Sequence, residues 1–172
     1  MSELNCPTCG AKGRPISQLT VDSLALDVVL DRLQNRQGFG YCPTATCPVA
    51  WFQPETGESV DKSDLKVRIG MKEVSAPRPI CYCFSHDASE FTEAIRKKGQ
   101  SDLPAEIAAK CKQGLDRCEE TNPQGSCCLG NVNHVIKTAR REMEQAVPIA
   151  QPFAMAADVD CCSTGKKDDG HE

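Results

Sequence analysis

The chain has 172 residues, a formal net charge of −4 and 12 cysteines, with 40% apolar and only 5% aromatic residues. This length suits one ordinary domain or two small ones. The acidic balance and the absence of a basic stripe argue against a nucleic-acid-binding protein, and no apolar run approaches the ~20 residues of a membrane span.

The N-terminal residues predict a cytoplasmic protein. Residues 1–5, Met-Ser-Glu-Leu-Asn, lack a basic region followed by an apolar run, so we expect no signal peptide and no membrane insertion. In a reducing cytosol, many cysteines indicate metal ligands rather than disulfides. The cysteines also occur in groups, at positions 6/9, 42/47, 81/83, 111/118, 127/128 and 161/162.

The first two groups predict a zinc site. Cys6-Pro-Thr-Cys9 is followed by Gly10, which lets the backbone turn so that amides point at sulfur. Cys42 and Cys47 flank a second turn with four residues between them. Four thiolates at Zn–S distances near ~2.3 Å leave no open coordination position. We therefore interpret Cys6, Cys9, Cys42 and Cys47 as the ligands of a structural zinc ion.

The segments between and after these cysteines predict a small mixed module. Residues 21–33 show partial helical periodicity, with Thr20 as the expected N-cap. Residues 49–53 are rich in strand formers, and residues 65–69 alternate like a strand. We expect a small sheet that carries the second cysteine pair, with Trp51, the only tryptophan, in its core.

A proline-containing connector follows at residues 70–79, where Pro77 and Pro79 favour extended backbone. It divides the chain into a zinc-binding module at residues 1–75 and a second module at residues 76–147, and residues 148–172 have the composition of a flexible tail. The expected fold class is α+β, with a small zinc-ribbon-like α/β module followed by a small helical module.

A Cys-x-Cys pair opens the second module. Cys81 and Cys83 come from one short extended turn, and further thiols follow in a glycine- and proline-containing loop at residues 118–128. Four thiolates converging on one point suit a metal ion or an iron–sulfur cluster. A cluster is favoured because helices are expected to start just after Cys83, where Asp87 begins a capping-box-like sequence, and just after Cys128. Helix N-termini offer free N–H groups and a favourable dipole to an anionic cluster.

Two sequences carry a family resemblance: Pro79-Ile-Cys-Tyr-Cys-Phe84 and Asn122-Pro-Gln-Gly-Ser-Cys-Cys-Leu-Gly-Asn-Val132. They resemble the bacterioferritin-associated ferredoxins, which are small helical [2Fe-2S] modules. They are more closely similar to the N-terminal half of the CopZ-type copper chaperones, over roughly residues 4 to 145. Those chaperones join a zinc module to a [2Fe-2S] module and usually to a copper-binding domain.

The resemblance implies a set of cluster ligands. Cys81, Cys83, Cys118 and Cys128 match the residues that hold the [2Fe-2S] cluster in that family. The last two of them are separated by nine residues, a longer step than in the ferredoxins, so Cys127 is an alternative to Cys128.

Helices are also expected at residues 87–98 and after Ser101, which is the expected N-cap of the second helix. Cys111 lies on the apolar face of the second of these helices, so we interpret it as a core thiol, with a ligand role as the alternative. His86 and His134 are interpreted as surface or capping residues, and His86 has a second interpretation as a donor or ligand near the cluster.

The tail contains the vicinal pair Cys161 and Cys162. Here the sequence departs from the chaperones it resembles, because it has no Met-x-Cys-x-x-Cys copper loop. Exposed vicinal thiols capture a soft ion such as Cu(I) or Hg(II). The alternative is an oxidation-prone end without a role.

We find no phosphate-binding loop, nucleophilic serine motif or paired-histidine motif, so we expect no enzyme. The resemblance implies a zinc- and [2Fe-2S]-containing protein that transfers single electrons and takes part in copper or other soft-metal trafficking. Its partner is then a redox or metal-accepting protein. The alternatives are a ferredoxin-type electron donor that docks to a partner protein and a redox- or iron-sensing adaptor.

Overall fold

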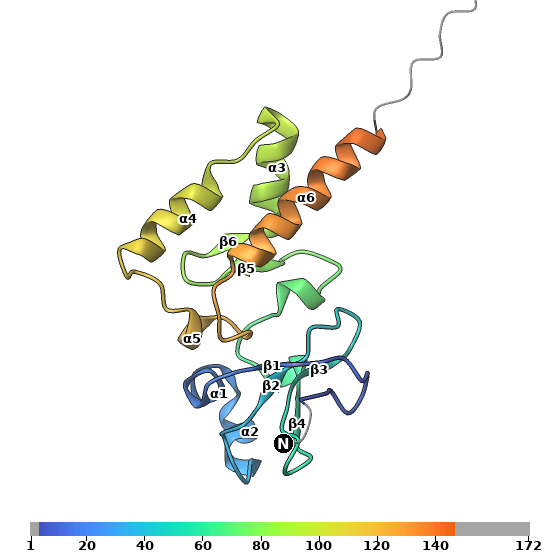
Figure 1. The fold of residues 1–172 in the computed structure, drawn as a ribbon, viewed down its shortest axis with the longest axis vertical. Coiled ribbons are helices and arrows are strands. Elements are labelled where there is room, and N and C mark those ends of the chain that lie inside the picture. Colours follow the sequence, from blue (N-terminus) through green and yellow to red (C-terminus); the bar gives the residue numbers. More distant parts are fainter. Residues whose placement is uncertain (1–3, 147–172) are drawn as a thin grey trace, which may run out of the picture.

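A four-stranded antiparallel sheet forms the centre of the N-terminal half (Figure 1). The computed structural model describes residues 4–146. The strands lie in sequence order: β1 (Arg14–Pro15), β2 (Gly40–Tyr41), β3 (Val49–Phe52) and β4 (Ser59–Asp61). All four residues of β3 are buried, and they contribute both to the apolar cluster around Trp51 and to the one around the first four cysteines. The strand expected at residues 49–53 is thereby confirmed.

Two short helices pack beside this sheet: α1 (Gln18–Leu24) and α2 (Asp27–Arg32). The expected single helix over residues 21–33 with Thr20 as N-cap is wrong. Ser17 is the N-cap, and its hydroxyl accepts a hydrogen bond from the Thr20 amide. The helix stops at Ala25 because the backbone there is extended and pairs with Leu65 in an isolated β-bridge.

The expected strand over residues 65–69 is also wrong. This segment runs between two 3-10 helices, η1 (Lys62–Asp64) and η2 (Gly70–Lys72). Leu65 and Ile69 do turn into the core, which explains the alternating pattern. The backbone nevertheless bonds to the break between the helices, through Lys66 N to Leu24 O at 2.8 Å, and so it does not join the sheet.

The second half is mostly helical: β5 (Pro79–Cys81), β6 (His86–Asp87), α3 (Ala88–Lys98), α4 (Leu103–Lys112), α5 (Cys118–Thr121) and α6 (Leu129–Ala146). The expected capping box at the start of α3 is confirmed. The Asp87 side chain accepts a hydrogen bond from the Glu90 backbone N–H, and the Glu90 side chain accepts one from the Asp87 backbone N–H. α4 starts after Asp102 rather than after the expected cap, Ser101. None of the helices within residues 4–146 is both long and apolar enough to cross a membrane.

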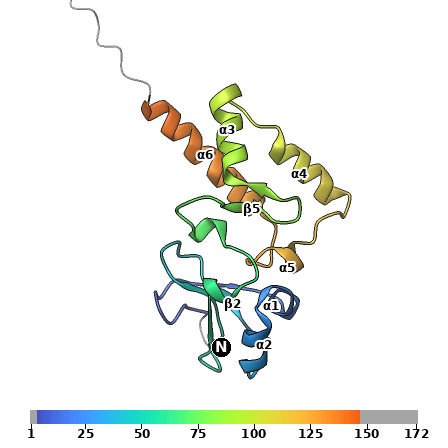
Figure 2. The same cartoon turned by 180° about the vertical axis from the view of Figure 1, so that it is seen from behind.

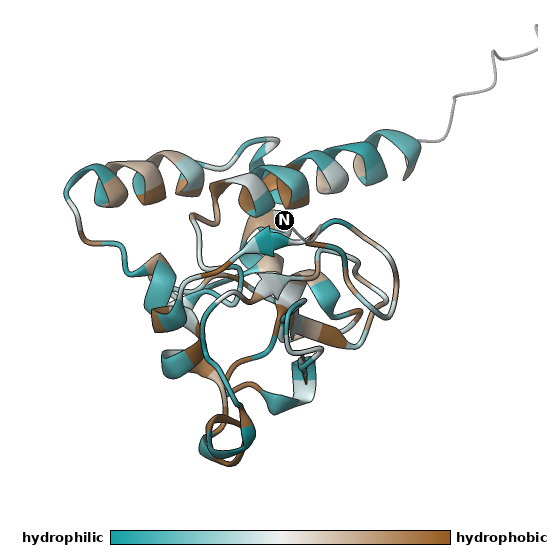
Figure 3. Ribbon diagram, turned by 60° about the horizontal axis from the view of Figure 1, so that its bottom comes forward, coloured by the Kyte–Doolittle hydropathy of each residue, from teal (hydrophilic) through white to brown (hydrophobic). Residues whose placement is uncertain are grey.

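The helical half has its own apolar core. Phe91 and Ile95 of α3 meet Val132 and Ile136 of α6, and α4 adds Ile107; each is at most 7% exposed. Figure 3 shows that α6 carries mostly hydrophilic residues on the face that points away from this core. The boundary between modules at residues 75 and 76 stays a prediction, but separate apolar clusters lie on either side of it.

The two halves are joined by specific hydrogen bonds. The Trp51 indole N–H donates to Pro123 O at 2.7 Å, across 72 positions of sequence, and both atoms are buried. The Tyr82 hydroxyl donates to Arg68 O at 2.9 Å and accepts from the Gly70 amide at 3.2 Å. Figures 1 and 2 show α5 beside α1 from opposite sides, which places the cysteine loop of the second half against the first half.

We predict that Gly70→Ala destabilises this joint. A Cβ at Gly70 would collide with Pro79 O and would lie 2.8 Å from the Arg78 carbonyl carbon, so backbone atoms would have to move. Overpacking of this kind costs about 1–3 kcal/mol. We expect a lower urea midpoint for the metal-loaded protein, followed by circular dichroism. Gly130→Ala is the control, because its Cβ meets nothing within 4 Å in α6; an equal loss in both variants would contradict the prediction.

Candidate metal centres

Two turns bring four sulfur atoms together at the edge of the sheet. Cys6 and Cys9 lie in the first turn, which Gly10 closes with φ 73° and a hydrogen bond from its amide to Cys6 O at 2.8 Å. Cys42 directly follows β2 and Cys47 precedes β3, so the sheet fixes the second turn. The four Sγ atoms all lie within 4.8 Å of one another.

This arrangement fits a tetrahedral ion. The Sγ atoms of Cys9 and Cys42 are 3.5 Å apart, and those of Cys6 and Cys47 are 4.0 Å apart. Four sulfurs at Zn–S distances of ~2.3 Å define a tetrahedron with edges of about 3.8 Å. The spacing therefore suits zinc, and four sulfur ligands are typical of a structural zinc site with no open position.

The four thiols differ in their readiness to ionise. A hydrogen bond with the Thr44 hydroxyl lowers the pKa of Cys9 to about 6. Burial raises the pKa of Cys42 to about 12, and it also raises the pKa of Cys47. Without a cation, ionising the buried members is costly, because the charged form is desolvated beside other sulfurs. A divalent cation would remove that cost for all four sulfurs at once.

Lys72 contacts the second cysteine turn, a contact that the sequence analysis missed. Its side chain is buried, with 4% of the residue exposed, and Nζ donates to Thr44 O at 2.6 Å and to Cys47 O at 3.3 Å. Nζ also lies 5.7 Å from the centre of the Tyr41 ring. A zinc ion with four thiolates carries a net charge of about −2. Lys72 would thus place a positive charge at the backbone of the second turn, where it would offset the charge of a bound zinc site.

The second set of cysteines is arranged differently, as two pairs. The Sγ atoms of Cys83 and Cys118 are 3.6 Å apart. A hydrogen bond from Cys128 lowers the pKa of Cys81 to about 6, and the same bond raises the pKa of Cys128. Within residues 4–146, only the first four cysteines form a group of three or more Cys, His, Asp or Glu ligand atoms that all lie close to one another. The sulfurs of the second set therefore do not form one tight cluster.

A backbone amide and a hydroxyl group lie at the sulfur of Cys83, one member of the Cys83–Cys118 pair. The Arg117 amide donates to Cys83 Sγ at 3.2 Å, and Thr121 Oγ1 lies 3.3 Å from the same sulfur. α5 begins at Cys118 itself, a helix start that the sequence analysis did not anticipate. α6 begins directly after Cys128, as expected, and Val132 N donates to Cys128 O at 3.0 Å. The Thr121 hydroxyl itself donates to Arg117 O at 2.8 Å, so the Arg117 amide is the donor that favours anionic sulfur at Cys83.

The remaining candidates lie around this set. His86 Nδ1 is 2.9 Å from Glu90 Oε2, so the histidine is engaged by the first turn of α3. His134 is exposed on α6. Cys111 is partly buried against the helical core, and Cys127 is exposed. Cys161 and Cys162 lie outside the described residues.

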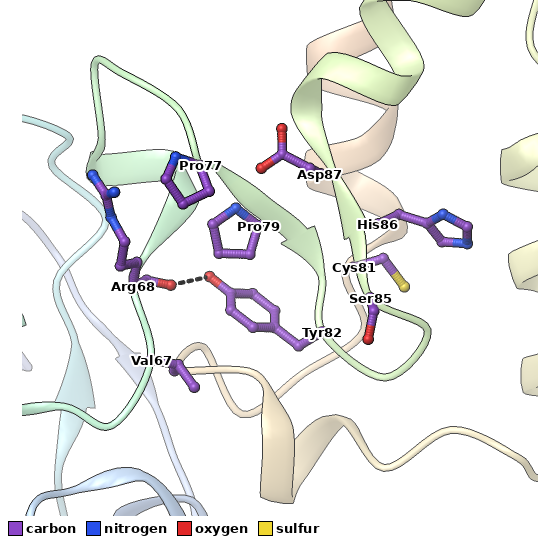
Figure 4. Close-up of a pocket in the computed structure, with 9 residues that line it drawn as sticks. All are labelled: Val67, Arg68, Pro77, Pro79, Cys81, Tyr82, Ser85, His86 and Asp87. Atoms are coloured by element: carbon purple, nitrogen blue, oxygen red, sulfur yellow. Dashed lines mark hydrogen bonds between the residues drawn. The ribbon is translucent and has the colours of Figure 1, made fainter.

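A hollow of about 380 Å³ lies at the joint beside Cys81 (Figure 4). The side chains of Cys81 and Tyr82 leave the chain on opposite sides, as alternating residues of an extended segment do. Tyr82 points across the hollow to Arg68, while the sulfur of Cys81 points away from it. Burial raises the pKa of Tyr82 to about 12, so its hydroxyl stays protonated and able to donate.

Comparisons with known proteins agree with this picture for zinc. Residues 3–66 match the CopZ-type family described as a zinc binding domain. The copper chaperone CopZ of Archaeoglobus fulgidus is 31% identical over 125 residues, which are 73% of this chain and 58% of that protein. The X-ray structure of the N-terminal domain of the same CopZ superposes with a TM-score of 0.63 and 27% identity, covering 76% of this chain and 96% of that one.

The chain therefore spans less than two thirds of the curated relative that it matches. The expected zinc-binding and copper-chaperone-like character of the N-terminal part is confirmed by these likenesses, together with the convergence of four cysteines. The [2Fe-2S] part of the expected resemblance stays a prediction.

We predict that Lys72→Met weakens zinc binding. The change removes a buried positive charge and leaves the Thr44 and Cys47 carbonyls without their donor, which costs about 1–3 kcal/mol. Because ~1.4 kcal/mol is a factor of ten, we expect roughly tenfold weaker zinc binding in competition with a chelator. Lys66→Met is the control, since Lys66 makes an exposed ion pair with Asp27. Unchanged zinc affinity in Lys72→Met would refute the charge-offsetting role.

Proposed function

We propose that this chain is a zinc- and [2Fe-2S]-containing protein that handles copper or another soft metal and exchanges single electrons, and that it is not an enzyme. Cys6, Cys9, Cys42 and Cys47 would hold the structural zinc. Cys81, Cys83, Cys118 and Cys128 would hold the cluster. The copper part of the proposal is supported by the relative that carries the name copper chaperone.

The pairing of the second set of sulfurs supports a cluster over a single ion. In a [2Fe-2S] centre with four cysteine ligands, each iron binds two thiolates, and the two pairs are separated by the cluster itself. The separate Cys83–Cys118 and Cys81–Cys128 pairs suit this requirement. Bound there, the cluster would supply one-electron exchange, which is the cofactor's own chemistry.

The protein's own groups would set the conditions for that exchange. The Arg117 amide donates to the sulfur of Cys83, and hydrogen bonds to cluster sulfurs are among the factors that set a reduction potential. Cys81 and Cys128 are at most 2% exposed, whereas Cys83 is partly exposed. Electrons would therefore enter and leave on the side of Cys83, where a partner protein can approach.

We predict that the protein purified without oxygen contains two iron and two sulfide per chain, in addition to one zinc. Iron, sulfide and zinc analyses check the composition, and a rhombic paramagnetic signal after reduction checks the cluster type. A colourless protein that holds zinc but takes up no iron on reconstitution would eliminate the cluster. A protein with the cluster that binds no copper would instead favour an electron donor or a redox sensor.

We predict different outcomes for the two adjacent cysteines before α6. Cys128→Ser should abolish or strongly alter the visible spectrum, because Cys128 is 2% exposed and lies with Cys81 in the buried cluster of the helical half. Cys127→Ser should leave the spectrum nearly unchanged, because Cys127 is exposed. The two variants form a matched pair with the same substitution at neighbouring positions. The opposite pattern would assign the fourth ligand to Cys127.

A further inference from the structure

The loop between Cys118 and Cys128 is tied to the other half of the chain by one buried hydrogen bond. The Trp51 indole N–H donates to Pro123 O at 2.7 Å, and both residues are buried. Pro123 lies midway in sequence between the two cysteines. A buried tryptophan N–H is a donor that needs a partner, so this bond fixes the middle of the loop against the first half.

Trp51 itself is held too firmly to follow a movement of the loop. It lies in β3, the strand between β2 and β4, where it pairs with Tyr41 on one side and with Val60 on the other. Its side chain is 0% exposed and belongs to the apolar cluster of the first half. Moving the indole would disturb both the sheet and this cluster, so the indole is a fixed donor that the loop must meet.

The side chain of Asn122 makes the loop rigid enough to carry this constraint to its ends. Asn122 is 1% exposed, and its Oδ1 accepts from the Gln124 amide at 3.1 Å while its Nδ2 donates to Ser126 O at 2.6 Å. Its own amide donates to Cys118 O at 3.0 Å. One buried side chain thus joins the end of α5 to the residues before α6. Fixing the middle of the loop therefore fixes both of its ends.

A glycine brings the loop into close contact with the first half. Gly125 has φ 61°, and a Cβ there would lie 2.9 Å from Thr20 Oγ1 and 3.4 Å from Ile16. Glycine permits both this left-handed backbone and the close approach. Because Ile16 belongs to the same apolar cluster as Trp51, the loop packs on the core that holds the indole.

We propose that Trp51 is a positioning residue for the [2Fe-2S] cluster, because its indole N–H sets where Cys118 and Cys128 lie. The inference rests on the proposed function and deepens it. In the proposed ligand set, Cys81 and Cys83 come from β5 and the turn after it, and the other two cysteines come from the ends of this loop. Trp51 therefore acts on the spacing between the two parts of the set, through the backbone of the loop rather than through a sulfur.

The position of the loop also governs a hydrogen bond to a proposed cluster ligand. Arg117 directly precedes Cys118, and its amide donates to Cys83 Sγ at 3.2 Å. A shift of the loop would lengthen or break this bond. Because hydrogen bonds to the sulfurs help to set the reduction potential of a cluster, an indole of the first half would tune a centre in the second half.

The test uses the full chain, purified without oxygen and loaded with zinc, and two variants that loosen the loop from opposite halves. Trp51→Phe keeps an aromatic ring in the core and removes the N–H, and Asn122→Ala removes the carboxamide. Val60→Ala is the control, since Val60 pairs with Trp51 in the same buried core and has no polar side-chain group to bond to the loop. Each variant is measured before and after iron and sulfide are added.

In the iron-free protein, we expect hydrogen exchange at residues 118–128 to be roughly tenfold faster in both loop variants, because each leaves a buried backbone group without its partner. Val60→Ala should not speed exchange selectively in this loop. In the iron-loaded protein, both loop variants should shift the g values of the reduced cluster and release iron to a chelator about tenfold faster. A general loss of stability would not shift the g values of protein that circular dichroism shows to be folded.

Two outcomes would overturn the role of Trp51. In the first, Trp51→Phe leaves both the exchange of the loop and the g values as they are in the parent protein. In the second, Val60→Ala changes both as strongly as Trp51→Phe does. If Trp51→Phe does not fold, the single tryptophan is replaced biosynthetically by benzothienylalanine, which keeps the shape of the indole but has sulfur in place of the N–H.

The positioning role and the proposed function can fail separately. A chain that takes up no iron would refute the cluster. In that chain, the exchange of the loop alone decides whether Trp51 positions the two cysteines. A chain with two iron per molecule and an unchanged loop in Trp51→Phe would support the cluster and overturn the role of the indole.

Discussion

Repulsion between sulfur anions is the constraint on which this structure depends. Thiolates brought within about 4 Å of one another need a cation, a shared proton or a set of donors. The first four cysteines have Lys72 behind their second turn, and the second set has the Arg117 amide and the start of α6. In a chain with 5% aromatic residues, the apolar cores are small, so bound metal is expected to supply much of the stability.

The sheet and the helices position the two sets of cysteines in different ways. A rigid antiparallel sheet positions Cys42 and Cys47 at the two ends of one short loop, which gives the compact grouping that a single ion requires. In the second half, β5, α5 and α6 each contribute a cysteine at or near an end. Ends of separate elements can be spaced more widely, and this produces two pairs rather than one group.

Structural features that depend on residues close together in sequence were predicted correctly. Features that depend on contacts between distant residues were missed. The first two cysteine pairs, the strand around Trp51 and the capping box at Asp87 all depend on residues close in sequence, and the structure contains each of them. The helix over residues 21–33 was wrong because its break is set by pairing with Leu65, 40 positions from Ala25. Lys72 gave no signal, since its acceptors lie 28 and 25 positions away. The identity of the second centre rests on resemblance and stays open to experiment.

The bond from Trp51 to the Pro123 carbonyl has a practical consequence. This is the only tryptophan in the chain, and its indole reaches from the core of the first half to the loop that carries Cys118 and Cys128. Its fluorescence therefore arises at the contact between the two halves and nowhere else. Opening of that contact would change the solvation of a single buried indole, and a coloured centre in the adjoining loop would quench its emission. The native chain thus carries its own optical probe for whether its two halves remain docked.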